Sequence, residues 1–334
     1  MRSLKLFAGL IAAGILGVGV AHAADPIKIR GAWVAPVTNW ASIWLEKKDL
    51  AKHFGKSYMF EAVRFQGTPP MITAIANNEL EVSNLAYSTL AIAVQNAGMD
   101  DIRVIADEFQ DGVPGYYTQE YMVLADGPIN KPEDLKGKVV ATNASGSAVD
   151  VAMRAMLRKF GLEDKRDYTM VEAPFPTMRA MLAEKKVDMI PAVLPFSLDP
   201  ELRKIGRPLF NQRDAIGVTQ MIVWAVRKPF IDKNRAVLVD YMEDSLRIAR
   251  WYMDPANHKE AMEIAARVTK QPAERFDWIF TNRDTFRDPN MLPNLDALQK
   301  NVDMTKDLGF VKATVDVKKH ADLSIVQEAA NRLK

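Results

Sequence analysis

The chain has 334 residues, with 44 Lys and Arg against 42 Asp and Glu, 48% hydrophobic residues and no cysteine. The near-neutral charge argues against a surface for nucleic acid or anionic membrane, and the lack of cysteine excludes disulfides, thiolate nucleophiles and the acylated cysteine of a bacterial lipoprotein. A chain of this length and hydrophobic content can bury a large core, and two domains are the natural expectation.

The first residues have the pattern of a secretory signal peptide. Arg2 and Lys5 precede an apolar run, 6–20, which is followed by Ala21-His22-Ala23. The run is shorter than the roughly 20 residues of a membrane-spanning helix, and a small-residue cleavage site follows it directly. We therefore predict a signal peptide at 1–23, a mature chain that begins at Ala24, and a periplasmic location; a retained anchor is the alternative.

Strand-like and helix-like runs alternate in the first third of the mature chain, which favours βαβ units. Thr68-Pro69-Pro70 is typical of a helix start. The expected strands are 27–34, 58–65, 82–86 and 102–106, and the expected helices are 40–54, the segment from 69 to about 80, and 89–96.

A second unit of the same kind begins near Tyr121. Ser147 and Asp150 have the spacing of an N-terminal capping box, which starts a helix that ends at Phe160-Gly161. The strands expected here are 121–124, 139–141, 168–172 and 187–193, with a further helix at 177–185. A strand at 217–226 and amphipathic helices at 235–253, 259–268 and 295–308 complete the pattern. No flexible linker separates two domains, so strands that cross between lobes explain the pattern better than a tether.

Several segments, in order, resemble a known family. The run 131–139 (KPEDLKGKV) looks like the entry to the second lobe of ABC-transporter substrate-binding proteins of the sulfonate, nitrate and taurine (NMT1/THI5-like) class. The runs 65–75, 183–189 and 224–231 are similar to that family's first-lobe loop and helix, its "vDa" segment and its returning strand. Lys186 stands where the family often has glycine.

The resemblance implies an α/β, two-lobed periplasmic binding protein fold of type II, with mixed sheets flanked by helices and a cleft between the lobes. It implies a discontinuous lobe one, 24–118 plus 219–334, and a lobe two at 119–218. The expected function is capture of a small organic anion, a sulfonate or carboxylate, by hinge closure and its delivery to an ABC permease in the inner membrane. We expect a monomer that binds no nucleic acid.

Polar loops that lead into helices are the expected anion site, because helix N-termini present unpaired N–H groups and partial positive charge. Hydroxyls in these loops can cap the helix, contact the ligand, or both. Aromatic residues near strand ends can enclose an organic group or pack as core. The predicted ligand-binding residues are Trp33, Thr38, Asn39, Trp40, Gly67, Thr68, Tyr87, Ser88, Ser145, Gly146, Ser147, Ala148, Phe196 and Trp224.

Catalytic readings have little support in the sequence, so we expect no enzyme, no cofactor and no metal site. The histidines of the mature chain are isolated, and His53 is interpreted as a partner of a helix C-terminus. Asp107, Glu108 and Asp111 are expected in an exposed loop after a strand, and the run 275–288 as a solvated face. The alternatives that stay open are a binding protein for a thiamine-precursor pyrimidine, another vitamin-like ligand or an aromatic ligand, and an enzyme of pyrimidine biosynthesis on the same fold.

Overall fold

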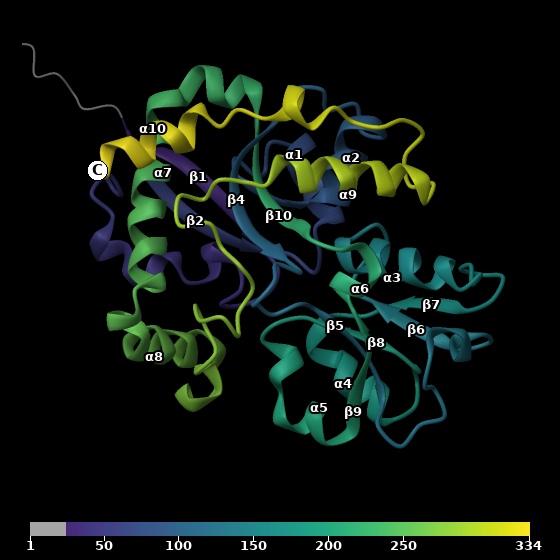
Figure 1. The fold of residues 1–334 in the computed structure, drawn as a ribbon. Helices are drawn as coiled ribbons and strands as arrows, with labels where there is room; N and C mark the ends of the chain where they lie inside the picture. Colours follow the sequence, from purple (N-terminus) through teal and green to yellow (C-terminus); the bar gives the residue numbers. More distant parts are fainter. Residues whose placement is uncertain (1–24) are drawn as a thin grey trace, which may run out of the picture.

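The computed structural model describes residues 25–334, so the predicted signal peptide and the predicted N-terminus at Ala24 lie outside the described residues. Two lobes built from α-helices and mixed β-sheets lie side by side (Figure 1). Within the described residues, no helix is both long and apolar enough to cross a membrane.

The sheet of lobe one is built around the central strand β10. β1 (Ile27–Trp33) and β2 (Tyr58–Arg64) are parallel, while β10 (Thr219–Arg227) runs antiparallel to both β3 (Ser83–Ala86) and β4 (Ile102–Asp111). A parallel bridge between Gly31 and Val82 joins the two parts, which gives the order β2-β1-β3-β10-β4. Nearly every residue of β10 is buried, as expected of a strand covered on both faces.

Lobe two repeats this arrangement. β6 (Val139–Thr142) and β7 (Thr169–Glu172) are parallel, and β5 (Glu120–Leu124) is antiparallel to β8 (Ile190–Ala192) and β9 (Gly206–Asn211). A parallel bridge between Val140 and Met189 gives the order β7-β6-β8-β5-β9. The two sheets therefore share one topology, with the antiparallel strand in the fourth position.

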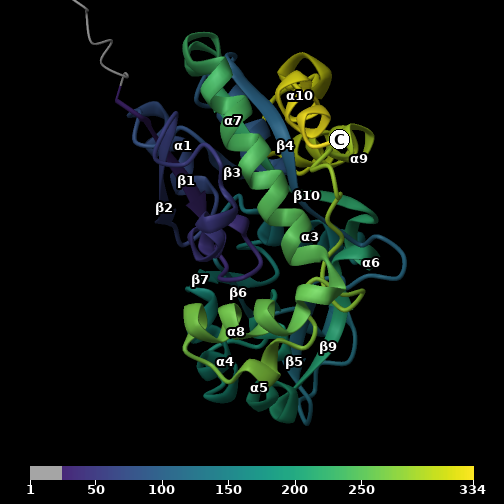
Figure 2. The same cartoon turned by 90° about the vertical axis from the view of Figure 1, so that its left-hand side faces the viewer.

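Helices cover both sheets, and the long helix α7 runs along lobe one (Figure 2). The α-helices of lobe one are α1 (Pro69–Ala76), α2 (Tyr87–Gln95), α7 (Lys228–Met253), α8 (His258–Thr269), α9 (Leu295–Asp307) and α10 (Ser324–Arg332). Those of lobe two are α3 (Ala148–Lys159), α4 (Phe175–Ala183), α5 (Pro200–Ile205) and α6 (Gln212–Ile216).

The chain crosses between the lobes after β4 and again before β10, which returns it to the sheet of lobe one. One buried apolar cluster contains residues of both lobes, among them Leu85 and Val223 from lobe one and Ala148 and Ile190 from lobe two. The lobes are thus packed against each other. The bounds 118/119 and 218/219 of the lobes stay a prediction.

Two local expectations about these elements are wrong, and one region had no expectation. The segment 40–54 forms two 3-10 helices, Trp40–Ser42 and Trp44–Leu50, in place of one α-helix. β4 continues to Asp111, so the three acidic residues expected in an exposed loop are buried within a strand. The region 199–216, which carried no assignment, forms α5, β9 and α6.

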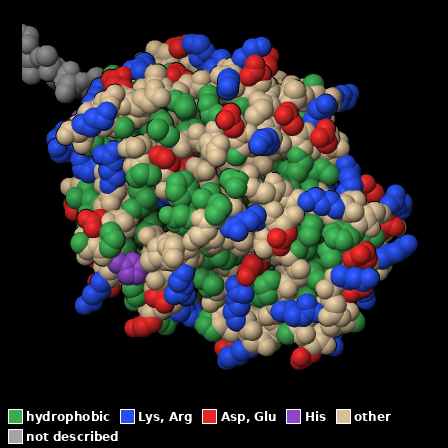
Figure 3. All heavy atoms as spheres, viewed as in Figure 1, with side chains coloured by type: hydrophobic (Ala, Val, Ile, Leu, Met, Phe, Trp, Pro, Cys, Tyr) green, Lys and Arg blue, Asp and Glu red, His purple; other side chains and the backbone are tan. Residues whose placement is uncertain are grey.

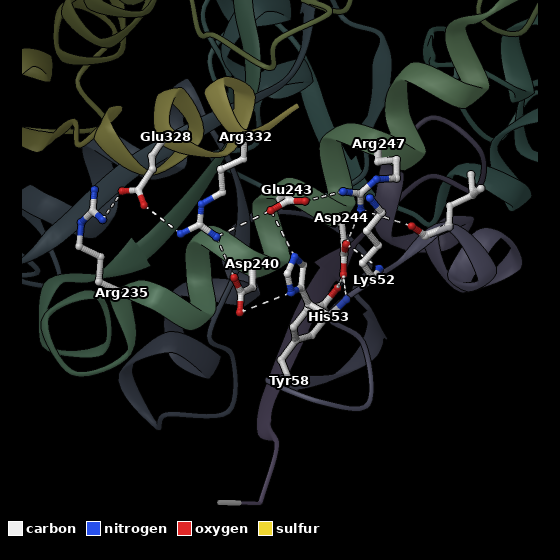
Figure 4. A network of polar contacts seen from close by, with 11 residues as sticks. Lys52, His53, Tyr58, Arg235, Asp240, Glu243, Asp244, Arg247, Glu328 and Arg332 are labelled. Atoms are coloured by element: carbon white, nitrogen blue, oxygen red, sulfur yellow. Dashed lines mark hydrogen bonds and ion pairs between the residues drawn. The ribbon is translucent and has the colours of Figure 1, made fainter. Parts of the chain in front are cut away.

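His53 has a different role from the one that we expected. Its ring nitrogens lie 3.2 Å from Glu243 and 3.7 Å from Asp240, both on α7 (Figure 4). Tyr58 donates to Asp244, on the same helix, at 2.8 Å. This polar network holds the β1–β2 region against α7, and it lies apart from the space between the lobes. Elsewhere on the face shown in Figure 3, charged side chains of both signs are interspersed.

Candidate functional site

A cavity of about 70 Å³ lies between the two lobes, where strand ends and helix starts converge. Lobe one contributes the loop after β1, the start of α1, and residues of β3, β4 and β10. Lobe two contributes the loop after β6, the starts of α3 and α4, and the segment after β8. Ligands of open α/β sheets bind in this position, beyond the strand ends. The polar lining residues are Thr38, Asn39, Thr68, Asn84, Asp111, Tyr117, Gln119, Asn143, Ser147 and Thr285.

The charged residue in this lining is Asp111, the last residue of β4. Thr118 donates to its carboxylate at 2.6 Å, and the backbone N–H of Gln119 donates at 2.9 Å. Burial raises the pKa of Asp111 to about 6, although both hydrogen bonds oppose the shift. Among the described lining residues, none is Lys or Arg.

A second acid, Glu108, lies behind the lining on the same strand. It accepts hydrogen bonds from the side chains of Asn39, Asn84 and Trp224 and, at 2.7 Å, from the backbone N–H of Trp40. Burial raises the pKa of Glu108 to about 7 against these donors. Glu108 therefore fixes the orientation of Asn39 and Asn84, which face the cavity.

Two lining residues carry polar atoms without a partner. Neither the Nε2 nor the Oε1 atom of Gln119 is hydrogen-bonded, and the same is true of Thr68 Oγ1. Gln119 is 2% exposed and Thr68 5% exposed, so little bulk solvent reaches these groups. Because buried polar groups are nearly always hydrogen-bonded, these atoms are the natural contacts of a bound molecule.

Five of the predicted site residues line the cavity. They come from the loop after β1 and from the starts of α1 and α3, and they are Thr38, Asn39, Thr68, Ser147 and Ala148. Thr38 also donates to the carbonyl of Leu194 in lobe two at 3.0 Å. The other predicted residues lie elsewhere, and their ligand contacts stay predictions.

Four predicted residues join the lobes without lining the cavity. Ser88 donates to the carbonyl of Gly146 at 2.8 Å, and Tyr87 donates to the carbonyl of Ala148 at 2.9 Å. Gly67 approaches Asn143 and Ala144 so closely that a Cβ would lie 2.7 Å from Asn143 Nδ2. Ser145 is exposed in the same loop as Gly146, beside a separate surface hollow.

Two of the aromatic residues expected near the solute, Trp40 and Trp224, lie in the core. Trp40 stacks on Phe280 at 5.4 Å and Trp224 on Tyr241 at 5.6 Å, and both are buried in the core of lobe one. Trp33 and Phe196 line a separate surface hollow. The aromatic residues of the cavity itself are Phe109, Tyr117 and Phe175.

The run 275–288 also differs from the expected solvated face. Arg287 and Asp284 are 7% and 1% exposed and form an ion pair at 2.8 Å. Arg287 donates to the carbonyl of Thr38 at 2.9 Å, which supports the loop after β1 from behind. Its charge is thus already paired.

The sequence reasoning missed Asn84, Asp111, Gln119 and Asn143. Asn84 lies inside a buried strand and Gln119 at the start of another, where no local motif marks a ligand contact. Asn143 lies just before the loop Ser145-Gly146-Ser147, which was predicted as a ligand site. The signal available for Asp111 was its position near the end of a strand that was expected to be buried. Within the described residues, no group of three or more His, Cys, Asp or Glu could hold a metal ion.

Comparison with solved structures shows the same fold at low sequence identity. The alkanesulfonate-binding protein SsuA from Xanthomonas axonopodis pv. citri, bound to MOPS, aligns with a TM-score of 0.70 and 17% identity over 90% of this chain and 99% of its own. The periplasmic nitrate-binding protein NrtA from Synechocystis PCC 6803 gives 0.72 and 15% over 94% and 90%. The desulfurization enzyme DSZB gives 0.65 and 13% over 92% and 100%.

No curated protein matches the chain in sequence. A family model described as the NMT1-like family matches residues 22–266, which is most of the chain. Both the order of elements in the two lobes and this match lead to one conclusion: the chain belongs to the NMT1-like family.

Proposed function

We propose that the protein is the periplasmic solute-binding component of an ABC importer. It captures a small organic solute between its lobes by hinge closure and delivers it to a permease of the inner membrane. The observation that carries the proposal is the cavity between the lobes, where the amide of Gln119 and the hydroxyl of Thr68 are buried without partners. The binding proteins for alkanesulfonate and nitrate that share the fold support it.

An organic anion, a sulfonate or carboxylate, is the ligand class that we propose. The apolar and aromatic part of the lining, with Phe109, Phe175 and Met221, fits an organic body better than an inorganic anion. A neutral pyrimidine or other vitamin-like solute is the second candidate, favoured by the acid Asp111 in the lining and the paired donor and acceptor of the Gln119 amide.

The enzyme DSZB shares the fold, so catalysis is the rival function. Binding is the better supported function, because none of the described histidines, His53, His258 and His320, lines the cavity. Catalysis would need a general base or nucleophile near the solute. Asp111, with a pKa raised to about 6 by burial, is the one titrating candidate among the described lining residues.

A ligand screen of the purified mature protein tests the proposal. The screen measures thermal stability with sulfonates, nitrate, aliphatic and aromatic carboxylates, and vitamin precursors. A solute that binds the native state alone stabilises it by about 2.7 kcal/mol at a hundredfold excess over Kd. We expect at least one organic solute to raise the melting temperature and to be recovered chemically unchanged.

The variant Gln119→Leu serves to locate the binding. It removes the amide but keeps the size of the side chain, so the response to that solute should fall while the unliganded melting temperature changes little. A solute that binds Gln119→Leu as tightly as the natural protein would place the site elsewhere. Conversion of the solute would replace the binding function with an enzymatic one.

A further inference from the structure

The inner cavity is built for an uncharged, hydrogen-bonding group. Asp111 supplies the only charge of its described lining, and that charge is negative. The buried cation in this region, Arg287, is already paired with Asp284 and with the carbonyl of Thr38. The Gln119 amide, by contrast, offers one unpaired donor and one unpaired acceptor, which match a group that both donates and accepts.

Two helix N-termini beside the cavity offer an anion less than usual. α1 begins with Pro69 and Pro70, which have no backbone N–H. At the start of α3, the buried carboxylate of Asp150 accepts the N–H of Gly146 at 2.8 Å and pairs with Arg154 at 2.8 Å. An acidic group inside the cavity would therefore face Asp111 without a cation to balance it.

The mouth of the cavity carries a positive charge, opposite to the negative charge of Asp111 in its lining. Val34 and Phe175 line both the cavity and an adjoining hollow of about 250 Å³, which Arg64 and Phe196 also line. Arg64 is the last residue of β2, at the same end of the sheet as the cavity, and its guanidinium lies 5.2 Å from the ring centre of Trp33.

Arg64 differs from two other arginines, Arg179 and Arg275. Arg179 and Arg275 both pair with Asp199, at 3.3 and 3.5 Å. No carboxylate among residues 25–334 pairs with Arg64, which is exposed. Phe175 and Phe196, stacked at 6.1 Å, line the same hollow as this guanidinium, and Phe175 also lines the cavity. The mouth thus offers a free cation next to aromatic surface.

We propose that the solute has two ends: an uncharged amide-like head held in the inner cavity by Gln119 and Thr68, and an acidic group at the mouth held by Arg64. The inference rests on the proposed function and makes it more specific. Arg64 is then the residue that selects organic acids over their uncharged analogues. Apolar surface in the cavity and its mouth covers the body that joins the two ends.

Isothermal titration of two matched ligand series tests this arrangement. One series is benzamide, 4-carbamoylbenzoate and benzoate, and the other is succinamide, succinamate and succinate. We expect the amide acids to bind more tightly than either the amides or the simple acids. Arg64→Gln should weaken the amide acids by about threefold to fivefold, as expected for one exposed ion pair, and leave the amides within about twofold. Added salt should reduce the difference in affinity for the amide acids between the natural protein and Arg64→Gln.

Two further variants control for charge and shape. Lys56→Gln removes a positive charge from an exposed residue of lobe one that lines neither the cavity nor its mouth, and it should leave both series unchanged. Arg64→Lys should retain part of the preference for amide acids.

The possible failures are distinct. Equal binding of amides and amide acids, or an unchanged ratio in Arg64→Gln, would overturn the role of Arg64. Tighter binding of benzoate or succinate than of the amide acids would overturn the uncharged head. Binding of other solutes in the screen, with no binding of either series, would also overturn the head-group assignment. If no solute of any class binds, the proposed function itself fails.

Discussion

Three acidic residues of one strand show how strongly burial changes the chemistry of this protein. Asp107, Glu108 and Asp111 are at most 1% exposed, and burial raises their pKa values to about 7, 7 and 6. Each has hydrogen-bond donors around it, such as Gln220, which donates to Asp107 at 2.6 Å. A group with a raised pKa stabilises the fold in its protonated form, so this contribution is lost as the pH rises.

Asp111→Asn should make the stability of the protein less dependent on pH. The pKa of Asp111 is about 6 in the folded protein against an ordinary 3.8, so its contribution is complete below pH 4 and is lost by about pH 6. A shift of about two units corresponds to roughly 3 kcal/mol. Urea unfolding from pH 4 to 7 should therefore show a smaller loss of stability for Asp111→Asn than for the natural chain. If the stabilities of the two proteins fell equally between pH 4 and 7, Asp111 would not be a buried carboxyl with a raised pKa.

At the scale of elements, the loop between β6 and α3 places two similar serines in different surroundings. Ser147 lines the cavity, donates to Asn143 at 2.9 Å and, as N-cap of α3, accepts the N–H of Asp150 at 3.4 Å. Ser145, two residues earlier, is exposed, and its backbone N–H donates to Glu172 at 2.8 Å. The left-handed backbone of Gly146 separates the two orientations.

Replacing each serine with alanine should separate ligand binding from loop structure. Ser147→Ala should weaken binding of the identified solute by about 1–3 kcal/mol, because a buried hydrogen-bonding group is lost. Ser145→Ala should change it by less than about 0.5 kcal/mol, as is usual for an exposed position. Calorimetry on both variants, with unfolding curves as the control for stability, checks this pair. If the two variants changed the affinity for the solute equally, the loop would not be part of the solute site.

For the whole molecule, side chains of one lobe bind backbone groups of the other, and the proposed closure would form these contacts. Tyr87 and Ser88 donate to carbonyls at the start of α3, and Gln66 donates to the carbonyl of Asn143 at 2.9 Å while Asn143 donates back to Gln66 at 3.2 Å. Water can replace these partners when the lobes separate, so opening leaves few groups unsatisfied. The solute can then shift the balance between open and closed forms.

Gly67→Ala should hinder closure without harming either lobe. The added Cβ would lie 2.7 Å from Asn143 Nδ2 and 3.0 Å from the Cβ of Ala144, and both contacts are across the lobes. We expect solute binding at least about tenfold weaker, equal to a loss of about 1.4 kcal/mol, with an unchanged unliganded melting temperature. In small-angle scattering, the natural protein should contract on binding and the variant should contract less. Equal contraction and affinity would show that the lobes close without this contact.

Local signals determined the order of elements. Thr68-Pro69-Pro70 predicts the start of α1, and Ser147 with Asp150 predicts the start of α3, because capping depends on neighbours in the chain. Gly161 follows α3 with a positive φ, as its position after the helix indicates. The match to the NMT1-like family agrees with the resemblance of the same segments.

Tertiary contacts decided the site. Thr68, Gln119 and Asn143 lie far apart in the chain, and only the packing of the two lobes brings them to one cavity. Packing also buried Asp111, and packing within lobe one placed Trp40 and Trp224 in its core. An acid after a strand and a tryptophan at a strand end favour the opposite environments when only near neighbours are considered. The sequence by itself therefore determined most of the elements and the family, whose signals are local or follow the chain order. It did not predict α5, β9 and α6. Which side chains meet a solute, and with what charge, depends on burial between distant segments, and burial is a property of the folded molecule alone.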